Sequence, residues 1–350
     1  MTPARVRHRV NRLSAQATAS PPSASERKEF RTWVLHFLDA TASQIRAEEL
    51  VNTITGWHES CSGTAVFAAS HCRVVVGDPS TTFTHCLLYE YTDEPESGLK
   101  TNLPRSLELG LSQLQQDAAA SPFATTSTGA SDVVPVALSC PQLLLTIDPG
   151  WFHLDRAAPE PTATITNWSA EPAEVLNAEI PSGLVGDRTP GNQVGKSAAT
   201  LEQLRAFLSD VELGEQKPGR GSLWHVNLLR FEDDAEKRSL YQQYAKAQGG
   251  RKGVLSQFGA RSTLAAKVWG TWERARSGES FKRRAPERSF DQVIIAEYPS
   301  RDAFLAMGAS EQYRAVSKLR HDALAETFII SMPKPDVLRS ERISRADEKI

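Results

Sequence analysis

Residues 199–335 alternate apolar strands with amphipathic helices in the order strand-helix-strand-strand-helix-strand. The central strand, Phe290–Tyr298, carries the run Val293-Ile294-Ile295, which is apolar on both faces. Such a strand needs a layer of protein on each side. Both predicted helices cover the same face of an antiparallel sheet, so the other face needs a partner sheet. The sequence therefore predicts an α+β fold whose second half cannot stand alone.

Periodicity and capping residues predict the elements of this second half. In chain order we expect a helix at Leu201–Leu208, a strand at Trp224–Phe231, a helix at Asp234–Ala247 that ends at Gly249-Gly250, extended segments at Val254–Phe258 and Leu264–Trp269, the strand Phe290–Tyr298, a helix capped by Ser300 and continued after Ser310, and a last strand at Thr327–Met332.

The first half carries a weak copy of the same pattern. Trp33–Asp39 aligns with Trp224–Phe231, which places His36 on Asn227, and Thr82–Tyr91 matches Ser289–Tyr298. We also expect a helix at Ala42–Ile54, a strand at Thr64–Ala69, a helix that ends at Gln113–Asp117 and a closing strand within Val133–Ile147. Our interpretation is two diverged copies packed sheet to sheet; the alternative is an unrelated α+β domain.

Composition divides the chain into five parts. Residues 1–28 are basic, with no acidic residue before Glu26, which is typical either of an organellar transit peptide or of a disordered tail on a cytoplasmic protein. A transit peptide would address the protein to the mitochondrion or plastid. The first folded domain is expected at 29–150, a Pro/Gly-rich linker at 151–198, the second domain at 199–335 and a charged tail at 336–350.

Bulk properties exclude two classes of partner. The formal net charge of −2 gives no general attraction to nucleic acid or to an anionic membrane surface. No apolar run approaches the roughly 20 residues that a membrane-spanning helix needs. We therefore expect neither nucleic acid nor membrane as a partner, and a small-molecule ligand instead.

Four ordered motifs connect the second half to a known family. Asn227-Leu228-Leu229-Arg230-Phe231, Gly249-Gly250-Arg251, Glu297-Tyr298-Pro299-Ser300 and the helix from Tyr313 to Arg320 resemble the family called domain of unknown function 1330. The resemblance implies the dimeric α+β barrel fold, in which two ferredoxin-like units enclose a cavity between their sheets. It implies no reaction, because relatives in that superfamily include monooxygenases and isomerases. With the internal repeat, we expect two such modules in tandem, as a monomeric pseudo-dimer or a homodimer.

Five polar residues are the candidate ligand contacts. Asn227 lies in an apolar strand and needs a hydrogen-bond partner, Arg230 can bind an anion, and Glu297 and Tyr298 can exchange protons. His36 is the counterpart of Asn227. Each also has a structural interpretation: an amide bonded to backbone, an ion pair of Arg230 with Glu232 or Asp233, a pairing of Glu297 with Arg320 or Arg301, and a core tyrosine. His321 is expected to be exposed.

No cofactor or metal is expected. His58, Cys61, His71, Cys72, His85 and Cys86 lack the paired spacing of a zinc site. Residues 190–197 lack the first glycine of a phosphate-binding loop. The sequence thus favours a small-molecule-binding barrel with monooxygenase-like or isomerase-like activity, and its alternative is a non-catalytic binding or assembly module. The filling of the space between the sheets discriminates the two hypotheses.

Overall fold

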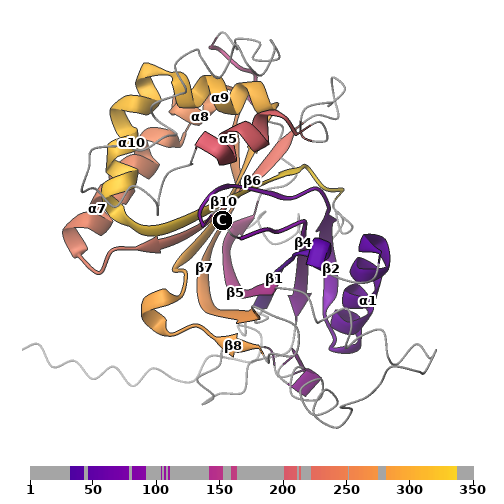
Figure 1. The fold of residues 1–350 in the computed structure, drawn as a ribbon. Coiled ribbons are helices and arrows are strands. Elements are labelled where there is room, and N and C mark those ends of the chain that lie inside the picture. The colour runs from indigo at the N-terminus through magenta and orange to yellow at the C-terminus, as the bar shows by residue number, and fades with distance from the viewer. Residues whose placement is uncertain are drawn as a thin grey trace, which may run out of the picture. The chain divides into compact units, whose positions relative to one another are not determined.

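A computed structural model gives the fold (Figure 1). It describes residues 32–42, 46–78, 81–91, 104, 106–107, 109–110, 142–152, 159–163, 201–210, 213, 222–250, 252–274 and 281–336. The predicted basic tail, most of the predicted linker and nearly all of the charged tail lie outside these residues.

Strands and helices alternate in both halves of the chain. The first half contains β1 (Thr32–Leu38), α1 (Ala47–Ser60), β2 (Thr64–Ala69), β3 (Arg73–Val76), β4 (His85–Tyr91) and β5 (Gln142–Phe152). The second half contains α5 (Leu201–Leu208), β6 (Leu223–Phe231), α7 (Ala235–Gln248), α8 (Val254–Gln257), β7 (Arg261–Arg274), β8 (Lys282–Arg283), β9 (Gln292–Tyr298), α9 (Arg301–Ala309), α10 (Glu311–Ala323) and β10 (Leu324–Pro333). Short 3₁₀ turns lie at Ala40–Ala42 and Pro286–Arg288.

One antiparallel sheet of ten strands links the two halves within the described residues. Its order is β2-β4-β1-β5-β7-β9-β6-β10-β3, with β8 paired to β7. The first half contributes its strands in the order second-third-first-fourth, counting β1, β2, β4 and β5, and the second half repeats that order with β6, β7, β9 and β10. The halves join where β5 pairs with β7 and where β10 pairs with β3.

We call β2-β4-β1-β5 and β7-β9-β6-β10 the two half-sheets. The main core lies between their inward faces. Trp33, Leu35 and Phe37 alternate on the inward face of β1, and Trp224, Val226 and Leu228 do so on β6. All six belong to one continuous cluster of buried side chains. Phe67 and Trp224 meet across the halves edge to face, with ring centroids 5.4 Å apart. This core is the partner layer that the apolar central strand requires.

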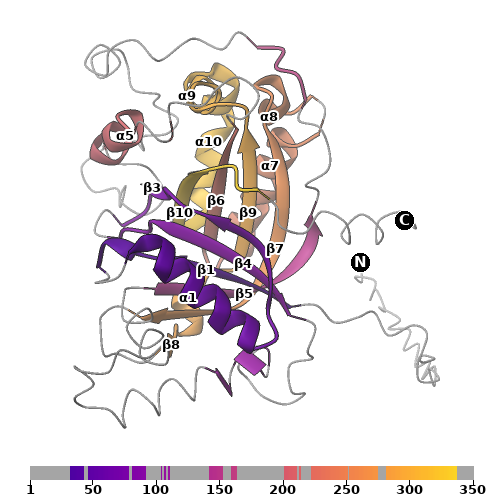
Figure 2. The ribbon, with the colours of Figure 1, turned by 90° about the vertical axis from the view of Figure 1, so that its right-hand side faces the viewer.

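The helices cover the outward faces of the two half-sheets. Figure 1 and Figure 2 show α1 beside the first-half strands and α7, α9 and α10 together beside the second-half strands. Val34 and Leu38 of β1 pack with Leu50 and Ile54 of α1. The expected mixed α+β fold with an antiparallel sheet is confirmed.

Serine and aspartate side chains begin the second-half helices as predicted. Ser300 accepts a hydrogen bond from the backbone N–H of Ala303, and Ser310 accepts one from Tyr313. Asp234 accepts bonds from the N–H groups of Glu236 and Lys237. Each cap satisfies N–H groups that have no partner within the helix.

One second-half segment was predicted wrongly. Val254–Phe258 was expected to be extended, but Val254–Gln257 forms the helical turn α8. Two glycines with positive φ flank this segment, Gly250 at 77° and Gly259 at 69°. They allow sharp reversals on each side, so the chain closes a single helical turn there. A segment this short does not discriminate between strand and helix by its periodicity.

The first-half elements are shifted from the predicted bounds. The helix expected at Ala42–Ile54 begins at Ala47 and continues to Ser60, with Glu48 and Glu49 in its first turn where acidic side chains are favourable. The closing strand begins at Gln142 and extends to Phe152. Residues 113–117 and 133–141 lie outside the described residues. The strand β3 was not predicted.

The shared core predicts the behaviour of a truncated chain. Deleting residues 1–150 removes the inward face opposite Trp224, Val226 and Leu228. Exposing large apolar side chains costs about 1.5–3 kcal/mol each. We therefore expect the remaining fragment to be insoluble or to form a homodimer, as measured by size-exclusion chromatography with light scattering. A well-behaved monomeric fragment would contradict this account of the core.

Candidate functional site

The space between the half-sheets is filled by side chains. Trp33, Phe37, Phe67 and Trp224 are all buried in the single cluster that occupies it. Because these side chains fill the space, they argue against a buried small-molecule site between the sheets. The polar candidates Asn227 and His36 instead point to the opposite, helix-covered faces, where they contact the helix layers.

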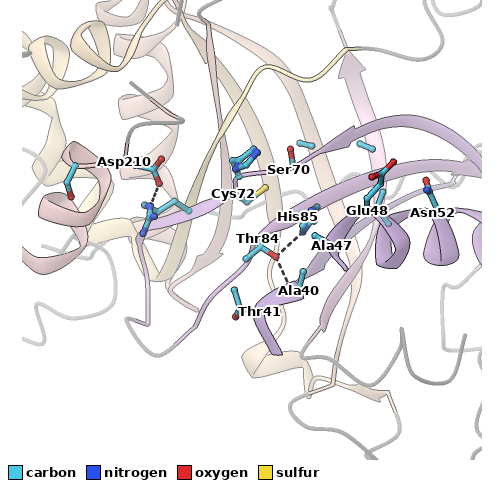
Figure 3. Close-up of a pocket in the computed structure, with 16 residues that line it drawn as sticks. Ala40, Thr41, Ala47, Glu48, Asn52, Ser70, Cys72, Thr84, His85 and Asp210 are labelled. Atoms are coloured by element: carbon cyan, nitrogen blue, oxygen red, sulfur yellow. Dashed lines mark hydrogen bonds and ion pairs between the residues drawn. The ribbon is translucent and has the colours of Figure 1, made fainter. Parts of the chain in front are cut away.

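An open cleft lies on the first half, at the N-terminal end of α1 (Figure 3). Its volume is about 860 Å³, within the range of small-molecule sites. In Figure 3, Glu48 and Asn52 lie on α1 at one side of the view, and Asp210 lies at the other side. Most of the lining comes from α1, from the end of β2 and the turn after it, from the start of β4 and from the residues after α5. The lining residues are Ala40, Thr41, Ala47, Glu48, Val51, Asn52, Ala68, Ala69, Ser70, His71, Cys72, Arg73, Thr84, His85, Ser209 and Asp210.

His85 is the best-oriented functional group in this cleft. Its Nδ1 lies 2.9 Å from the hydroxyl of Thr84, which also accepts a hydrogen bond from the N–H of Ala40. Burial lowers the pKa of His85, and the nearby His71 lowers it further. The ring is therefore neutral at neutral pH. Nε2 has no hydrogen-bond partner among the described residues and can donate to or accept from a ligand, depending on the tautomer.

Charge in the cleft does not favour an anion. Arg73 and Asp210 form an ion pair at 2.5 Å and largely neutralise each other. Glu48 adds a carboxylate, which only accepts hydrogen bonds. Cys72 is a thiol and not a thiolate, because burial raises its pKa above its ordinary value. Among the described lining residues, the available groups therefore suit an uncharged ligand with hydrogen-bond donors.

A second, smaller cavity lies on the helix side of the second-half sheet. Its volume is about 30 Å³, and it brings together two of the predicted ligand contacts, Asn227 and Tyr298. His225 of β6 and Arg320 of α10 are buried beside them. The remaining lining residues are Val76, Tyr244, Phe304, Met307, Tyr313, His321 and Ile329. His321, expected to be exposed, is half-buried here.

Asn227 and Tyr298 have defined partners in this cavity. The amide nitrogen of Asn227 donates to the carbonyls of His225 and Ile294 at 3.1 and 3.3 Å. The hydroxyl of Tyr298 points to the sulfur of Met307 at 3.7 Å. Burial raises the pKa of Tyr298, so its hydroxyl stays protonated and can only act as a donor or weak acceptor.

Glu297 and Arg230 form ion pairs that differ from the predicted ones. Glu297 pairs with Arg261 at 2.7 Å and Lys334 at 2.8 Å. Burial alone would raise the pKa of Glu297, but hydrogen bonds from Lys334 and Arg261 bring the pKa below its usual value. Arg230 pairs with Glu326 on the neighbouring strand, at 3.1 Å. Neither Glu297 nor Arg230 lines the open cleft or the second-half cavity.

His36 belongs to a buried chain of hydrogen bonds in the first half. Its Nε2 lies 2.7 Å from Oε1 of Gln142, and its Nδ1 lies 3.0 Å from Nε2 of His58. Nδ1 of His58 lies 2.6 Å from the hydroxyl of Tyr91. Tyr89 stacks on His58 with centroids 3.8 Å apart. The chain crosses from β5 through β1 and α1 to β4.

The chemistry of these groups sets the direction of every bond. Oε1 of Gln142 only accepts, so His36 carries its proton on Nε2 and accepts at Nδ1. His58 must then donate from Nε2 and accept from the hydroxyl of Tyr91. Both rings are neutral in this arrangement. Burial lowers the pKa of His36 to about 4 despite the bond to Gln142, and it lowers the pKa of His58 as well.

The described residues hold no group of three His, Cys, Asp or Glu side chains that could bind a metal ion. His58, one of the histidines named above in connection with zinc, uses both ring nitrogens in hydrogen bonds. Cys61, Cys72 and Cys86 are buried and form no disulfide with one another. Across the described part of the chain, no helix has the length and apolarity to cross a membrane.

Sequence reasoning missed the cleft. His85 was considered only as a metal ligand, and Glu48, Asn52 and Thr84 carried no signal, because α1 and β4 converge only in the folded chain. Arg320 is named in the sequence analysis only as a motif residue and as a possible partner of Glu297. Its place beside Tyr313 could have been inferred, because it lies seven residues later, which is two helical turns and therefore the same face of α10.

Comparison with known proteins assigns this chain to no family. No protein-family model and no curated protein matches it, so membership in the domain of unknown function 1330 family stays a prediction. A solved protein of unknown function from Rhodopseudomonas palustris is 23% identical over 39% of this chain and 93% of its own, with a TM-score of 0.28.

Two longer matches come from proteins named "putative monooxygenase". The one from Lactobacillus acidophilus is 8% identical over 88% of this chain and 99% of its own, with a TM-score of 0.32. The one from Fusobacterium nucleatum is 9% identical over 88% and 94%, also with a TM-score of 0.32. Likenesses this weak support no conclusion about the activity of this chain.

The buried histidines predict a loss of stability in acid. In the unfolded chain a histidine has a pKa of about 6.5, whereas the folded pKa of His36 is about 4. The stabilisation is complete above the unfolded pKa and is lost as the pH falls toward the folded one. We expect His36 alone to reduce the free energy of unfolding by about 3 kcal/mol across this window, as measured by urea unfolding.

Two matched substitutions test the source of this effect. His58→Asn removes one buried titrating ring and should flatten the dependence of the unfolding free energy on pH. His71→Asn is the control, because His71 is exposed and its left-handed backbone, with φ of 57°, suits asparagine. Equal slopes for His58→Asn and wild type would show that this ring is not the source.

Proposed function

We propose that this protein binds a small, uncharged, hydroxyl-bearing molecule in the cleft between α1, β2 and β4. The observation that carries the proposal is the 860 Å³ cleft containing a neutral histidine, His85, whose ring is oriented by Thr84. A cleft of this size can bury most of a metabolite, and a few placed polar groups are what give such sites their specificity.

The chemistry of the lining narrows the ligand class. The carboxylate of Glu48 accepts from a ligand hydroxyl, Nε2 of His85 either donates or accepts, and the Asn52 amide does both. Ala47, Val51 and Ala68 supply small apolar surface between these groups. A phosphate or carboxylate ligand would face Glu48 without a cation among the described lining residues other than Arg73, which is already paired with Asp210.

An isomerase-like step would need a base in the cleft, and neutral His85 is the residue that could accept a proton. Within the described residues, however, His85 bonds to a hydroxyl and not to a carboxylate that would raise its basicity. This favours the alternative from the sequence, a non-catalytic binding module. The described lining residues provide no group to which a monooxygenase-like step can be assigned.

We further propose that the chain is a tandem of two ferredoxin-like modules forming an intramolecular dimeric α+β barrel, with the modules at 29–150 and 199–335. The common strand order of the two halves supports this. So do His36 and Asn227, which occupy the same aligned position and both face their helix layers. In this barrel the ligand sites lie outside the closed space between the sheets.

Fragment screening by ligand-observed NMR, followed by protein-observed NMR of the histidine ring signals, tests the binding proposal. Hydroxyl-bearing fragments should bind wild type, and in the second measurement they should broaden or shift the His85 ring signals. Ala68→Trp, which places an indole in the cleft from an exposed position, should weaken that binding by about tenfold or more, equivalent to about 1.4 kcal/mol.

Thr64→Trp is the matched control. Thr64 lies on the same strand, is also exposed and does not line the cleft, so its substitution should leave fragment binding unchanged. Equal fragment binding by Ala68→Trp and wild type would contradict the proposed site. So would the absence of any hydroxyl-bearing fragment that binds wild type.

A further inference from the structure

The smaller, second-half cavity is lined by a residue with a buried nitrogen that has no hydrogen-bond partner. His225 is 1% exposed, and its Nδ1 has no partner among the described residues. Its other nitrogen, Nε2, lies 3.3 Å from the hydroxyl of Ser331. A buried polar atom that lacks a hydrogen bond destabilises the folded state. Because His225 lines the cavity, an occupant of the cavity can supply the missing partner.

A fixed positive charge lies in the same wall. Arg320 is 4% exposed, lines the cavity and donates to the hydroxyl of Thr327 at 3.1 Å. Burial disfavours its charge, but the hydroxyls of Tyr313, Tyr244, Tyr241 and Tyr298 outweigh burial and raise its pKa above the ordinary value. A guanidinium is charged at every physiological pH and matches the geometry of an oxyanion.

The tyrosines around Arg320 remain neutral donors. Burial raises the pKa of both Tyr244 and Tyr298, so these hydroxyls keep their protons beside the cavity. Together, Arg320 and the tyrosine hydroxyls make the lining of the cavity rich in hydrogen-bond donors. Such a lining favours an acceptor, and most strongly a negatively charged one.

His225 can complete this donor set through its tautomer. Burial lowers the pKa of His225 to about 3, so the ring is neutral and carries one proton. When the Ser331 hydroxyl donates to Nε2, that proton is on Nδ1 and faces the unpartnered side. The site can therefore offer a donor from β6 in addition to Arg320 of α10 without placing a second charge in the core.

We propose that this cavity binds a small monovalent oxyanion, of the size of formate, between Arg320 and His225. The volume of about 30 Å³ is two to three times the roughly 10–15 Å³ that one water requires, and is therefore sufficient for about three heavy atoms. Asn227 and Tyr298, the ligand contacts expected from the sequence, line this site. It is separate from the first-half cleft and does not depend on it.

Two sodium salts test the proposal on the full-length protein. Formate fits the cavity, whereas gluconate carries the same carboxylate charge on a molecule too large for it. With ¹⁵N-labelled histidine, sodium formate should shift the Nδ1 signal of His225 toward that of a protonated ring nitrogen and raise Tm in a saturable manner. Sodium gluconate at equal ionic strength should do neither.

Two arginine variants locate the charge that binds formate. Arg320→Met should weaken formate binding by about tenfold or more, the usual consequence of losing a charge-assisted hydrogen bond. Arg230→Met removes a cation paired with Glu326 outside the cavity and should leave formate binding unchanged. If Arg320→Met does not fold, His225→Phe retains a ring without its nitrogens and should abolish the effect of formate on Tm.

Equal effects of formate and gluconate on wild type would overturn the proposal. An unchanged Nδ1 signal at saturating formate would do the same, because it would mean that the cavity holds water alone. Formate binding that survives both Arg320→Met and His225→Phe would place the anion elsewhere and would also overturn it.

Discussion

The burial of one half-sheet against the other determines the rest of this structure. Each half has an outward face covered by helices and an inward face of alternating large apolar residues, such as Phe37 on β1 and Trp224 on β6. Neither inward face could remain in water without a large loss of stability. The edge pairings β5 to β7 and β10 to β3 then connect the two halves into one sheet.

Because apolar side chains fill the space between the half-sheets, the buried polar groups lie between each half-sheet and its helices. The first half has the Gln142–His36–His58–Tyr91 chain between sheet and helix, and the second half has the Arg320 and His225 cavity in the corresponding layer. The first chain satisfies its own hydrogen bonds, whereas the second leaves Nδ1 of His225 unpartnered. The partner that Nδ1 of His225 lacks is what a ligand bound in the second-half cavity would supply. The open cleft is a third location, at the end of α1.

Local signals made the second half predictable. Ser300 and Ser310 cap helices where the sequence indicated, and the apolar strands fall at the expected residues. Val254–Gln257 was misread because four residues are too few to show the period of a helix or of a strand. The strand β3 escaped prediction because its register is set by β10, some 250 residues away in the chain, and long-range pairing leaves no local pattern. The fold class was thus predictable, while the first-half bounds were not.

The candidate sites were less predictable than the fold. The sequence identified Asn227 and Tyr298 as polar residues in apolar strands, but it assigned them to a space between sheets that Trp224 and its neighbours fill. Glu297 and Arg230 lie in ion pairs whose partners, Arg261 and Glu326, come from other strands. Cleft residues such as Glu48 and His85 come together only through tertiary contacts.

The central claim is that the two halves share one closed core, and Phe67 and Trp224 are the pair that tests it most directly, since they meet across the halves at 5.4 Å. A double-mutant cycle with Phe67→Ala, Trp224→Ala and both together measures their coupling in the free energy of unfolding. The account predicts a favourable coupling of about 0.5–1.5 kcal/mol. Additive effects within about 0.3 kcal/mol would contradict a shared core.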